Sequence, residues 1–353
     1  MSIIPLIYEL EKNKKINNIL VTTSTLSSLK IFNNYKFKKV VHQFFPIDFF
    51  YFTSKFIKYW KPNIAIFIDS EIWPCIFKDL KKNSIPLLLM NARITSKSFT
   101  RWNFFNKFSK NIFHNIEAAF PQNSETDKFL RRLNVKKIKK IGNLKFCETK
   151  SQKIMNLEKP FLKSIKNRLI FCASSTHPRE ENEIAQTHLI LKKKYKNLLT
   201  IIIPRHIHRI NLIKEQLNQM GLKIHLHENK KRISKDTDIY LVNSYGQTKS
   251  FFSMCQNVFL GGSLINHGGQ NPLEAVRYGC NILHGPNVSN FDEIYSFLNS
   301  QKISFGIKKH NGMLKVLSKL LSSKKNQGNI KKKIHLKGEK ILKLTIKEID
   351  NYL

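Results

Sequence analysis

The chain has 353 residues, and its 61 lysines and arginines outnumber 24 aspartates and glutamates, which gives a formal charge of +37 at pH 7. At about 100–200 residues per domain, this length predicts two domains. Apolar residues make up 41% of the chain, which is enough to bury real cores and excludes wholesale disorder. Its five cysteines include no CxxC pair, so we expect buried thiols in a reducing compartment and neither a disulfide framework nor a zinc knuckle.

The longest apolar runs are far shorter than the ~20 residues that span a bilayer, so we expect no membrane-crossing segment. The N-terminal residues lead into glutamates and lysines without a small-residue cleavage site, which predicts a cytoplasmic protein. The positive charge has two interpretations. It fits a polyanionic partner, either a nucleic acid or an anionic membrane, and it also fits a lysine-rich composition spread along the whole chain.

In the first part of the chain, short β-branched runs alternate with amphipathic stretches, which is typical of βαβ units on a parallel sheet. The runs that predict strands are residues 18–23, 40–44, 63–68, 85–90 and 118–121. We assign residues 1–150 to a first Rossmann-like domain. Residues 151–166 are polar and lysine-rich and predict a linker.

The alternation then restarts and predicts a second Rossmann-like domain over residues 167–325, the domain that would bind the activated donor. Its predicted strands are residues 169–174, 198–203, 223–226, 238–242, 257–260, 281–284 and 304–307. Residues 326–353 predict a basic C-terminal helix with an apolar face made by Ile341, Leu344, Ile346 and Ile349. The predicted fold class is therefore α/β, with two doubly wound domains facing across a cleft.

Ligands of such sheets bind at the carboxyl ends of the strands, and the run 261–274 follows one of them. Its glycines let the backbone approach a ligand, and Asn271 is predicted to cap a helix that starts at Pro272, an end that attracts phosphate. Glu274 stands at capping-box spacing, so capping and binding of ribose hydroxyls both remain open. The glycines match neither GxGxxG nor a P-loop, which disfavours a dehydrogenase and an ATPase.

Other polar residues follow the remaining predicted strands. Arg205 presents a planar, charged fork suited to phosphate. His206 and His208 have no carboxylate at metal-ligand spacing, so no metal site is predicted. Glu71 opens a predicted helix, where the dipole alone would favour it, whereas the loop residue Lys145 has no obvious packing role. Together these groups indicate group transfer from a nucleotide-activated donor.

The same loops carry a resemblance that extends from about residue 2 to residue 300. The motifs are, in chain order, Glu71-Ile72-Trp73-Pro74, Asn91-Ala92-Arg93, Gly142-Asn143-Leu144-Lys145-Phe146, Ser175-Thr176-His177, Pro204-Arg205-His206, Gly261-Gly262-Ser263-Leu264 and Gly268-Gly269-Gln270-Asn271-Pro272-Leu273-Glu274. In order and spacing they resemble the 3-deoxy-D-manno-octulosonic acid (Kdo) transferase family. The resemblance implies a GT-B fold and an inverting transfer of Kdo from CMP-Kdo to the lipid A precursor in lipopolysaccharide core biosynthesis. It also implies the cytoplasmic face of the bacterial inner membrane as the location, and no metal or other cofactor.

The resemblance implies that residues 1–150 form the acceptor-binding domain, truncated at its start, and that residues 167–325 form the CMP-sugar-binding domain. It also assigns roles to individual residues. Glu71 and Lys145 are implied to stabilise the transition state. The implied CMP contacts are Pro204, Arg205, Tyr245, Gly246, Gln247, Asn271, Pro272, Leu273 and Glu274. At Gln247 the family more often has glutamate, and a contact through the backbone survives that difference.

The family's general base is a glutamate in a Ser-Val-Gly-Glu loop that follows a membrane-anchoring helix, and this sequence starts just after the place of that loop. A fragment or truncated gene model explains this, and a catalytically dead paralogue is the alternative. A positioned base contributes about 10²–10⁴-fold, so the chain as written is expected to bind CMP-Kdo and to transfer poorly.

Basic, aromatic stretches at residues 44–60 and 99–113 fit either contact with an anionic lipid surface or core-facing phenylalanines beside solvated lysines. Two rival functions remain. A basic nucleic-acid-binding protein fits the charge, but the chain has no recognised nucleic-acid motif, so no specific nucleic acid is predicted. Another nucleotide-sugar transferase of the same fold, for instance one that uses a UDP-sugar, fits the loops.

Overall fold

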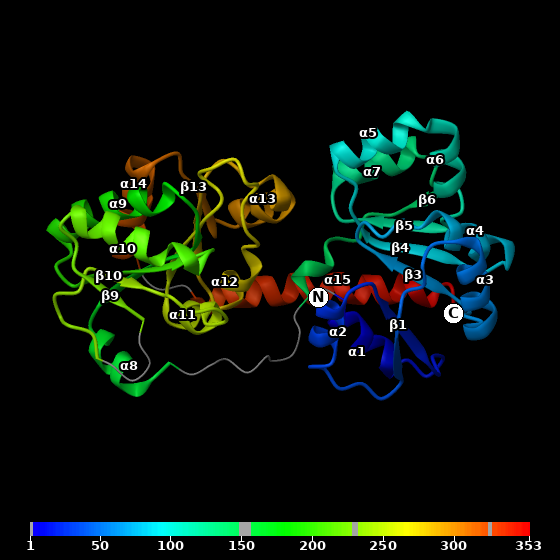
Figure 1. Ribbon diagram of the computed structural model, residues 1–353, viewed down its shortest axis with the longest axis horizontal. Helices are drawn as coiled ribbons and strands as arrows, with labels where there is room; N and C mark the ends of the chain where they lie inside the picture. The colour runs from blue at the N-terminus through cyan, green and yellow to red at the C-terminus, as the bar shows by residue number, and fades with distance from the viewer. Residues whose placement is uncertain (1–2, 148–156, 228–231, 324–326) are drawn as a thin grey trace. The chain divides into compact units, whose positions relative to one another are not determined.

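The computed structural model describes residues 3–147, 157–227, 232–323 and 327–353 (Figure 1). The chain divides into two compact units, which we call unit 1 (residues 1–150 and 336–353) and unit 2 (residues 151–335). The boundary near the C-terminus falls inside one continuous helix, α15 (Gln327–Asp350), so the last part of this helix belongs to the same unit as the N-terminus.

Unit 1 contains two groups of parallel strands. β1 (Ile19–Thr23) pairs with β2 (Val40–Phe44), and a four-stranded sheet follows in sequence order, made of β3 (Ala65–Ile68), β4 (Leu87–Ala92), β5 (Ala118–Pro121) and β6 (Lys137–Ile138). Its helices are α1 (Ile4–Lys12), α2 (Leu26–Phe32), α3 (Phe50–Trp60), α4 (Pro74–Lys82), α5 (Ser96–Phe104), α6 (Asn106–Phe113) and α7 (Ser124–Arg132). All five strands predicted in this half are present, with ends shifted by at most two residues.

The core of unit 1 forms around β4, which lies between β3 and β5 and is buried along its whole length. This explains why residues 87–90 are continuously apolar, since a central strand of a parallel sheet is covered on both faces. Figure 1 shows α5, α6 and α7 on one side of this sheet and α3 and α4 beside it. The loops after β3, β4 and β5 therefore emerge together at one edge.

Unit 2 is built on a seven-stranded parallel sheet in the order β13-β12-β11-β7-β8-β10-β9. The strands are β7 (Leu169–Thr176), β8 (Leu198–Pro204), β9 (Ile224–Leu226), β10 (Ile239–Leu241), β11 (Asn257–Leu260), β12 (Asn281–His284) and β13 (Ser304–Gly306). The chain starts in the middle at β7, winds outward through β8 to β9 and β10, and then returns to β11 on the other side. The sheet is therefore doubly wound, and the direction of winding switches between β7 and β11.

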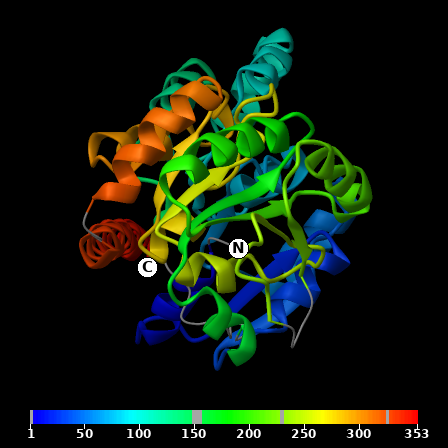
Figure 2. The same ribbon diagram turned by 90° about the vertical axis from the view of Figure 1, so that its left-hand side faces the viewer.

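Helices cover both faces of this sheet, as Figure 2 shows. On one face, α9 (Glu180–Lys194), α10 (Ile210–Gln219) and α14 (His310–Ser322) pack on the buried side chains of Phe171, Ile202 and Phe259. On the other face lie α11 (Thr248–Met254) and α12 (Leu273–Arg277), and α13 (Asp292–Ser300) runs beside β13. Successive side chains of a strand point to opposite faces of the sheet, and helices cover both faces. This explains why these strands are apolar at nearly every position.

The second half of the predicted linker is a helix in the structure. Residues 148–156 lie outside the described residues, and residues 159–165 form helix α8 (Lys159–Ile165). Phe161 of this helix packs on Tyr240, with ring centroids 4.7 Å apart, and on Phe251 at 6.2 Å. The apolar pair Phe161 and Ile165 at helical spacing was the sequence signal for this helix.

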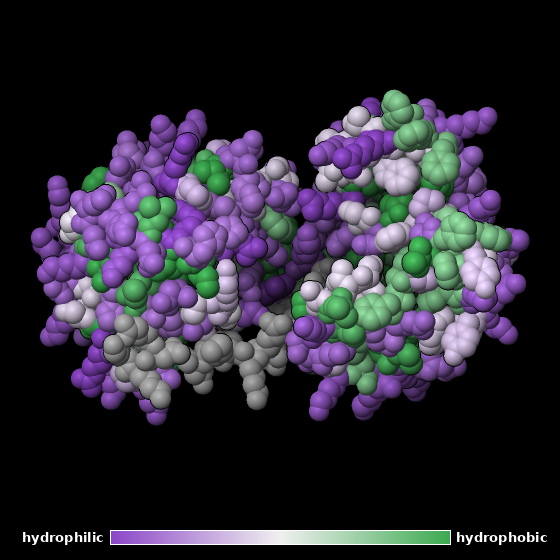
Figure 3. Space-filling model, viewed as in Figure 1, coloured by the Kyte–Doolittle hydropathy of each residue, from purple (hydrophilic) through white to green (hydrophobic). Residues whose placement is uncertain are grey.

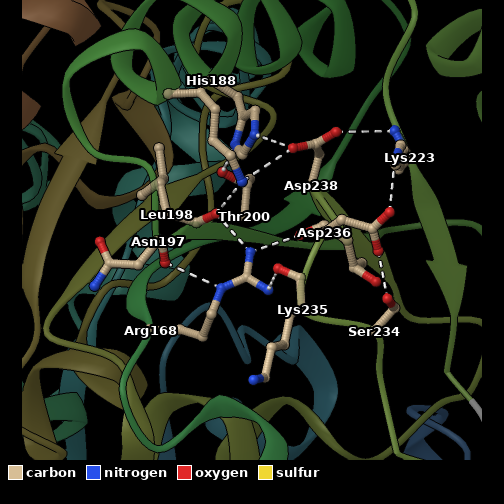
Figure 4. Close-up of polar contacts among 12 residues, drawn as sticks. Arg168, His188, Asn197, Leu198, Thr200, Lys223, Ser234, Lys235, Asp236 and Asp238 are labelled. Atoms are coloured by element: carbon tan, nitrogen blue, oxygen red, sulfur yellow. Dashed lines mark hydrogen bonds and ion pairs between the residues drawn. The ribbon is translucent and has the colours of Figure 1, made fainter.

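The amino ends of β7, β8 and β10 are closed by a polar network (Figure 4). The guanidinium of Arg168 donates four hydrogen bonds, to the backbone carbonyl oxygens of Asn197, Leu198, Lys235 and Thr237.

The fully buried His188 lies between the Thr200 hydroxyl at 2.8 Å and the Asp238 carboxylate at 3.4 Å. Burial raises the pKa of Asp238, but hydrogen bonds from His188, the Lys223 N–H and Lys192 outweigh it and hold the pKa well below its usual range.

Three expectations concern membrane-spanning helices, metal sites and the cysteines. Across residues 3–147, 157–227, 232–323 and 327–353, no helix combines the length and the apolarity needed to span a bilayer. In the same part of the chain, no cluster of His, Cys, Asp and Glu side chains is arranged to hold a metal ion. Four of the five cysteines are buried free thiols, as predicted, and Cys75 is partly exposed.

Candidate functional site

Lys145 of unit 1 lies in a short 3₁₀ turn, η1 (Leu144–Phe146), that three amide side chains hold in place. Asn91, near the end of β4, accepts the Leu144 N–H at 2.9 Å, and Asn143 accepts the Lys145 N–H at 2.9 Å. The Asn143 amide in turn donates to Gln122, which follows β5, at 3.2 Å. The position of the lysine is therefore fixed by loops from two neighbouring strands.

The backbone is strained next to this turn. Asp69, after β3, and Asn91 both adopt left-handed conformations, with φ of 58° and 51°, and the Asn91 amide donates to the Asp69 carboxylate. Burial lowers the pKa of the half-buried Lys145, Asp69 opposes this shift, and Arg93 adds to it. Non-glycine residues in such conformations persist where the surrounding structure enforces them, which marks this edge as a candidate site.

The C-terminal helix braces the same loop. A β-carbon at Gly142 would lie 2.8 Å from the side chain of Ile341, and one at Gly338 would lie 2.5 Å from the carbonyl oxygen of Phe146. The Cys147 thiol donates to the Gly338 carbonyl oxygen at 3.5 Å. Of the predicted apolar face of α15, Ile341 and Ile349 are buried, and Leu344 and Ile346 are half-buried.

The prediction that Glu71 opens a helix is wrong. Helix α4 begins at Pro74, and two of its first N–H groups donate to the carboxylate of Asp48, which comes from an earlier loop. Glu71 is an exposed loop residue whose carboxylate accepts the indole N–H of Trp73 at 2.8 Å. The helix dipole therefore does not explain this glutamate.

In unit 2, Pro204 and Arg205 lie at the carboxyl end of β8. Pro204 is buried as the last residue of the strand. Arg205 follows it, its N–H donates to the Thr176 carbonyl oxygen at 3.0 Å, and its side chain is exposed. The guanidinium is thus free to point into solvent at the edge where ligands of parallel sheets bind.

The predicted segment 245–247 follows β10, the strand next to β8. Tyr245 is 66% exposed, Gly246 has a φ of 84°, and the buried Gln247 precedes the first residue of α11. A β-carbon at Gly246 would meet no described atom within 4 Å, so this glycine is needed for its backbone conformation and not for space.

The segment 271–274 follows β11 and contacts α11. Asn271 accepts the Leu273 N–H at 3.1 Å, as a capping side chain does, but helix α12 begins at Leu273, one residue later than predicted. The exposed carboxylate of Glu274 lies 3.6 Å from the ammonium of Lys249 in α11. The structure thus brings the segments 245–247 and 271–274 together, whereas Arg205 lies on the other side of β7 from the second of them.

The glycines at 261–262, which were predicted to let the backbone approach a ligand, contact other parts of this chain. The fully buried carboxylate of Glu180, at the start of α9, accepts the N–H groups of Gly262 at 2.8 Å, Ser263 at 3.1 Å and Leu264 at 3.0 Å. A β-carbon at Gly261 would lie 2.3 Å from the Ser175 carbonyl oxygen. The chain's own anion therefore occupies this cradle, and the glycines allow close packing against the end of β7.

Sequence reasoning gave no role to Glu180 or to three further groups at this edge. The hydroxyls of Ser174 and Ser244 and the Nε2 atom of His177 are buried, and none has a hydrogen-bond partner within the described ranges. Ser174 lies near the end of β7, His177 directly follows that strand, and Ser244 follows β10. The available signal was a cluster of Ser, Thr and His directly after a buried strand.

The aromatic stretches of unit 1 are largely exposed. Phe104, Phe105 and Phe108 are 81%, 61% and 57% exposed, and only Phe113 of that group is fully buried. The core-facing interpretation is therefore wrong for the first three and right for the fourth. The exposed aromatic surface also includes Phe49, Phe50, Tyr51, Phe52 and Tyr59, and Figure 3 shows apolar and aromatic atoms gathered along the edge of unit 1 formed by α3, α5 and α6.

Comparison with solved structures defines the fold class. A UDP-GlcNAc 2-epimerase from Neisseria meningitidis bound to UDP-GlcNAc aligns with a TM-score of 0.62 at 12% identity, over 99% of this chain and 96% of that one. A structure described as the glycotransferase of kitacinnamycin aligns with a TM-score of 0.58 at 8% identity, over 100% and 95% of the two chains. The fold is α/β, of the GT-B type found in glycosyltransferases.

Comparison of sequences gives the family. The model of the 3-deoxy-D-manno-octulosonic-acid transferase (kdotransferase) family matches residues 1–148. A 3-deoxy-D-manno-octulosonic acid transferase of Rickettsia felis is 33% identical over 322 residues, which cover 91% of this chain and 69% of that protein. The transferase of Haemophilus influenzae is 26% identical over 297 residues, 83% and 70% of the two chains. The chain belongs to the 3-deoxy-D-manno-octulosonic acid transferase family and is a glycosyltransferase.

Proposed function

We propose that this chain transfers Kdo from CMP-Kdo to the lipid A precursor, with inversion at the anomeric carbon, in lipopolysaccharide core biosynthesis. Unit 2 binds the CMP portion through Arg205, the segment 245–247 and the segment 271–274. The observation that supports this most is the position of these residues: each group follows a strand at the ligand-binding edge of a doubly wound sheet. The identity to Kdo transferases over most of the chain supports the choice of sugar.

The chemistry explains why cationic side chains are needed. Kdo leaves CMP through an oxocarbenium-like state at a carbon that also bears a carboxylate, so the leaving phosphate and this carboxylate both need positive partners. Arg205 is assigned to the phosphate because its exposed fork is always charged. Lys145 and Glu71 are assigned to stabilising the transition state. The acceptor hydroxyl must also lose a proton to a general base.

Binding of the nucleotide tests the donor assignment directly. CMP is expected to raise the melting temperature of the purified chain and UMP to have a much smaller effect. Arg205→Ala should weaken CMP binding about 10–100-fold in isothermal titration calorimetry, because it removes a charge-assisted contact. Arg131→Ala, which removes an exposed arginine of unit 1 paired with Asp127, is the matched control and should bind CMP like the parent. Stabilisation by UMP equal to that by CMP would contradict the choice of donor.

The transfer step has a separate test. In an assay with CMP-Kdo and a lipid A precursor, Lys145→Gln and Glu71→Gln should each lower the rate of transfer by about 10²-fold while leaving CMP affinity unchanged. A variant that transfers at the parental rate would remove that residue from the mechanism. The configuration of the product, read by NMR, tests inversion.

We also propose that the exposed aromatic surface of unit 1 rests on an anionic membrane, where the lipid acceptor is found. Its phenylalanines are interleaved with lysines such as Lys107 and Lys110, the combination that binds anionic interfaces. Flotation with anionic vesicles should recover the chain, and the triple substitution of Phe104, Phe105 and Phe108 by Ser should reduce recovery. Equal recovery with neutral and anionic vesicles would contradict the proposal.

A further inference from the structure

The edge of unit 2 where the winding switches, between β7 and β11, holds an unusual group of side chains. Ligands of doubly wound sheets bind outside the carboxyl ends of the strands at this point. Here Ser174, Ser175 and His177 end β7 and its loop, and Gly262 and His267 follow β11. The imidazole rings of His177 and His267 lie 4.5 Å apart, measured between centroids.

Four backbone N–H groups at this edge are already used. Glu180 accepts the N–H groups of Gly262, Ser263 and Leu264, and it also accepts the His177 N–H at 2.9 Å. These four groups therefore do not serve a ligand, and the nearby side chains become the candidates for recognition.

The contacts of His177 define its tautomer. Its Nδ1 lies 3.0 Å from the carbonyl oxygen of Ser175, and a carbonyl oxygen only accepts, so Nδ1 carries the proton and Nε2 presents a lone pair. Ser175 has a φ of 56°, a left-handed conformation that a serine rarely adopts, and this turns its carbonyl toward the ring. The orientation of the imidazole is thus fixed by a strained residue.

The other ring nitrogen is an unused acceptor. The residue is 5% exposed, and no described group lies within hydrogen-bond reach of its Nε2. A buried polar atom without a partner costs about 1–3 kcal/mol, so such an atom at a ligand-binding edge indicates that a ligand supplies the partner. The neighbouring imidazoles of His206 and His267 are exposed, so they can turn aside without disturbing the core.

We propose that Nε2 of His177 accepts a hydrogen bond from a hydroxyl group of the nucleotide-sugar donor. The inference rests on the proposed function and adds a binding residue to it. Because Nε2 carries no proton, it can only accept, so its partner must be a donor such as a hydroxyl and not an ionised phosphate oxygen, which Arg205 is better suited to hold. Burial lowers the pKa of His177, and the neighbouring His267 lowers it further, so the ring is neutral at pH 7.

The hydroxyl belongs either to the ribose or to Kdo, and ligand pairs distinguish the two. Dissociation constants for CMP, 2′-deoxy-CMP, 3′-deoxy-CMP and CMP-Kdo are measured by calorimetry on the parent chain and on His177→Leu. The substitution should weaken binding of the ligand that carries the hydroxyl about 10-fold, the loss of one hydrogen bond to a buried acceptor. A ribose contact predicts equal binding of CMP and the relevant deoxy analogue by the variant. A Kdo contact predicts unchanged CMP binding and weaker CMP-Kdo binding.

Two further variants make the test independent of folding. His177→Gln keeps an acceptor near the position of Nε2 and should recover part of the affinity. His208→Leu removes a nearby exposed imidazole and should bind all four ligands like the parent.

The inference is overturned if His177→Leu binds all four ligands as tightly as the parent, or if it weakens all four equally, since then no hydroxyl is involved. Failure of the parent chain to bind either CMP or CMP-Kdo contradicts the proposed function and the inference with it. Parental binding of CMP-Kdo by both His177 variants contradicts the inference alone.

Discussion

A buried histidine at each edge of the unit 2 sheet is bonded in a different way. At the amino edge, His188 contacts Thr200 through one ring nitrogen and Asp238 through the other, and Arg168 donates to backbone carbonyl oxygens beside them (Figure 4). At the carboxyl edge, His177 contacts the Ser175 carbonyl oxygen through Nδ1, and its buried Nε2 has no partner among the residues that the structure describes. Both edges are rich in charge and in histidine, so composition alone does not separate them. What distinguishes the two histidines is whether both ring nitrogens already have a partner.

The largest effect on stability is expected at Gly261, where the loop after β11 packs against the end of β7. Gly261→Ala would place a β-carbon 2.3 Å from a backbone carbonyl oxygen, which cannot move aside without displacing the end of β7. We expect a loss of about 3 kcal/mol or more in the free energy of unfolding, measured by urea denaturation. Gly246→Ala is the control for open space around a glycine, and it should cost only about 1 kcal/mol because its φ is positive. Equal losses in the two variants would show that space does not limit Gly261.

The second largest effect on stability is expected at the amino edge of the unit 2 sheet. Arg168→Ala removes four hydrogen bonds to carbonyl oxygens and should lower the free energy of unfolding by about 2–3 kcal/mol. Because the carboxyl edge is untouched, CMP affinity should stay at the parental value. Lys235→Ala, which removes an exposed side chain of a loop whose backbone Arg168 contacts, is the control for stability. A loss of CMP binding without a loss of stability would reverse the roles of the two edges.

The titratable groups at the amino edge also predict that the stability of the protein depends on pH. Burial lowers the pKa of His188, so the folded state keeps it neutral while the unfolded chain takes up a proton below about pH 6.5. Its contribution to stability is therefore present above that pH and is lost as the pH falls. Asp238, whose pKa is also lowered, adds a second loss below about pH 3.8, the unfolded value.

Urea denaturation of the parent chain and of His188→Gln between pH 8 and pH 5 measures the first of these effects. The slope of stability against pH should be smaller in the variant. An unchanged slope would mean that other groups cause the dependence.

The smallest effect on stability is expected at the carboxyl edge. Ser244→Ala removes a buried hydroxyl without a described partner, so the free energy of unfolding should change by less than about 0.5 kcal/mol or should increase. If the edge binds the donor, the same change should weaken CMP binding measurably. A clear loss of stability without any effect on binding would make Ser244 part of the scaffold.

The sequence was most informative where burial decides the structure. The strands of unit 2 are covered on both faces, so their β-branched runs were recognisable, whereas the two-residue β6 of unit 1 was not predicted. Local rules were less reliable at the ends of helices. Glu71 looked like a first-turn carboxylate, but Pro74 starts the helix, and Asp48, distant in sequence, caps it.

Contacts between distant residues could not be predicted at all. The carboxylate of Glu180 reaches backbone groups more than 80 residues away, and no local pattern announces that it fills the glycine-rich loop. Likewise, the exposure of Phe104 and Phe108 depends on which face of α5 and α6 meets the sheet, and a mixture of Phe and Lys fits both orientations.

The packing of α15 against the loop that carries Lys145 also affects the order in which the two units are completed during synthesis. The residues of unit 2 are contiguous, whereas unit 1 needs both the first 150 residues and those from 336 onward. A ribosome therefore makes all of unit 2, up to residue 335, before it makes the part of α15 that packs on Gly142. Unit 1 is thus begun first but completed after unit 2, and Lys145 reaches its final position only after residues 338–341 have been made.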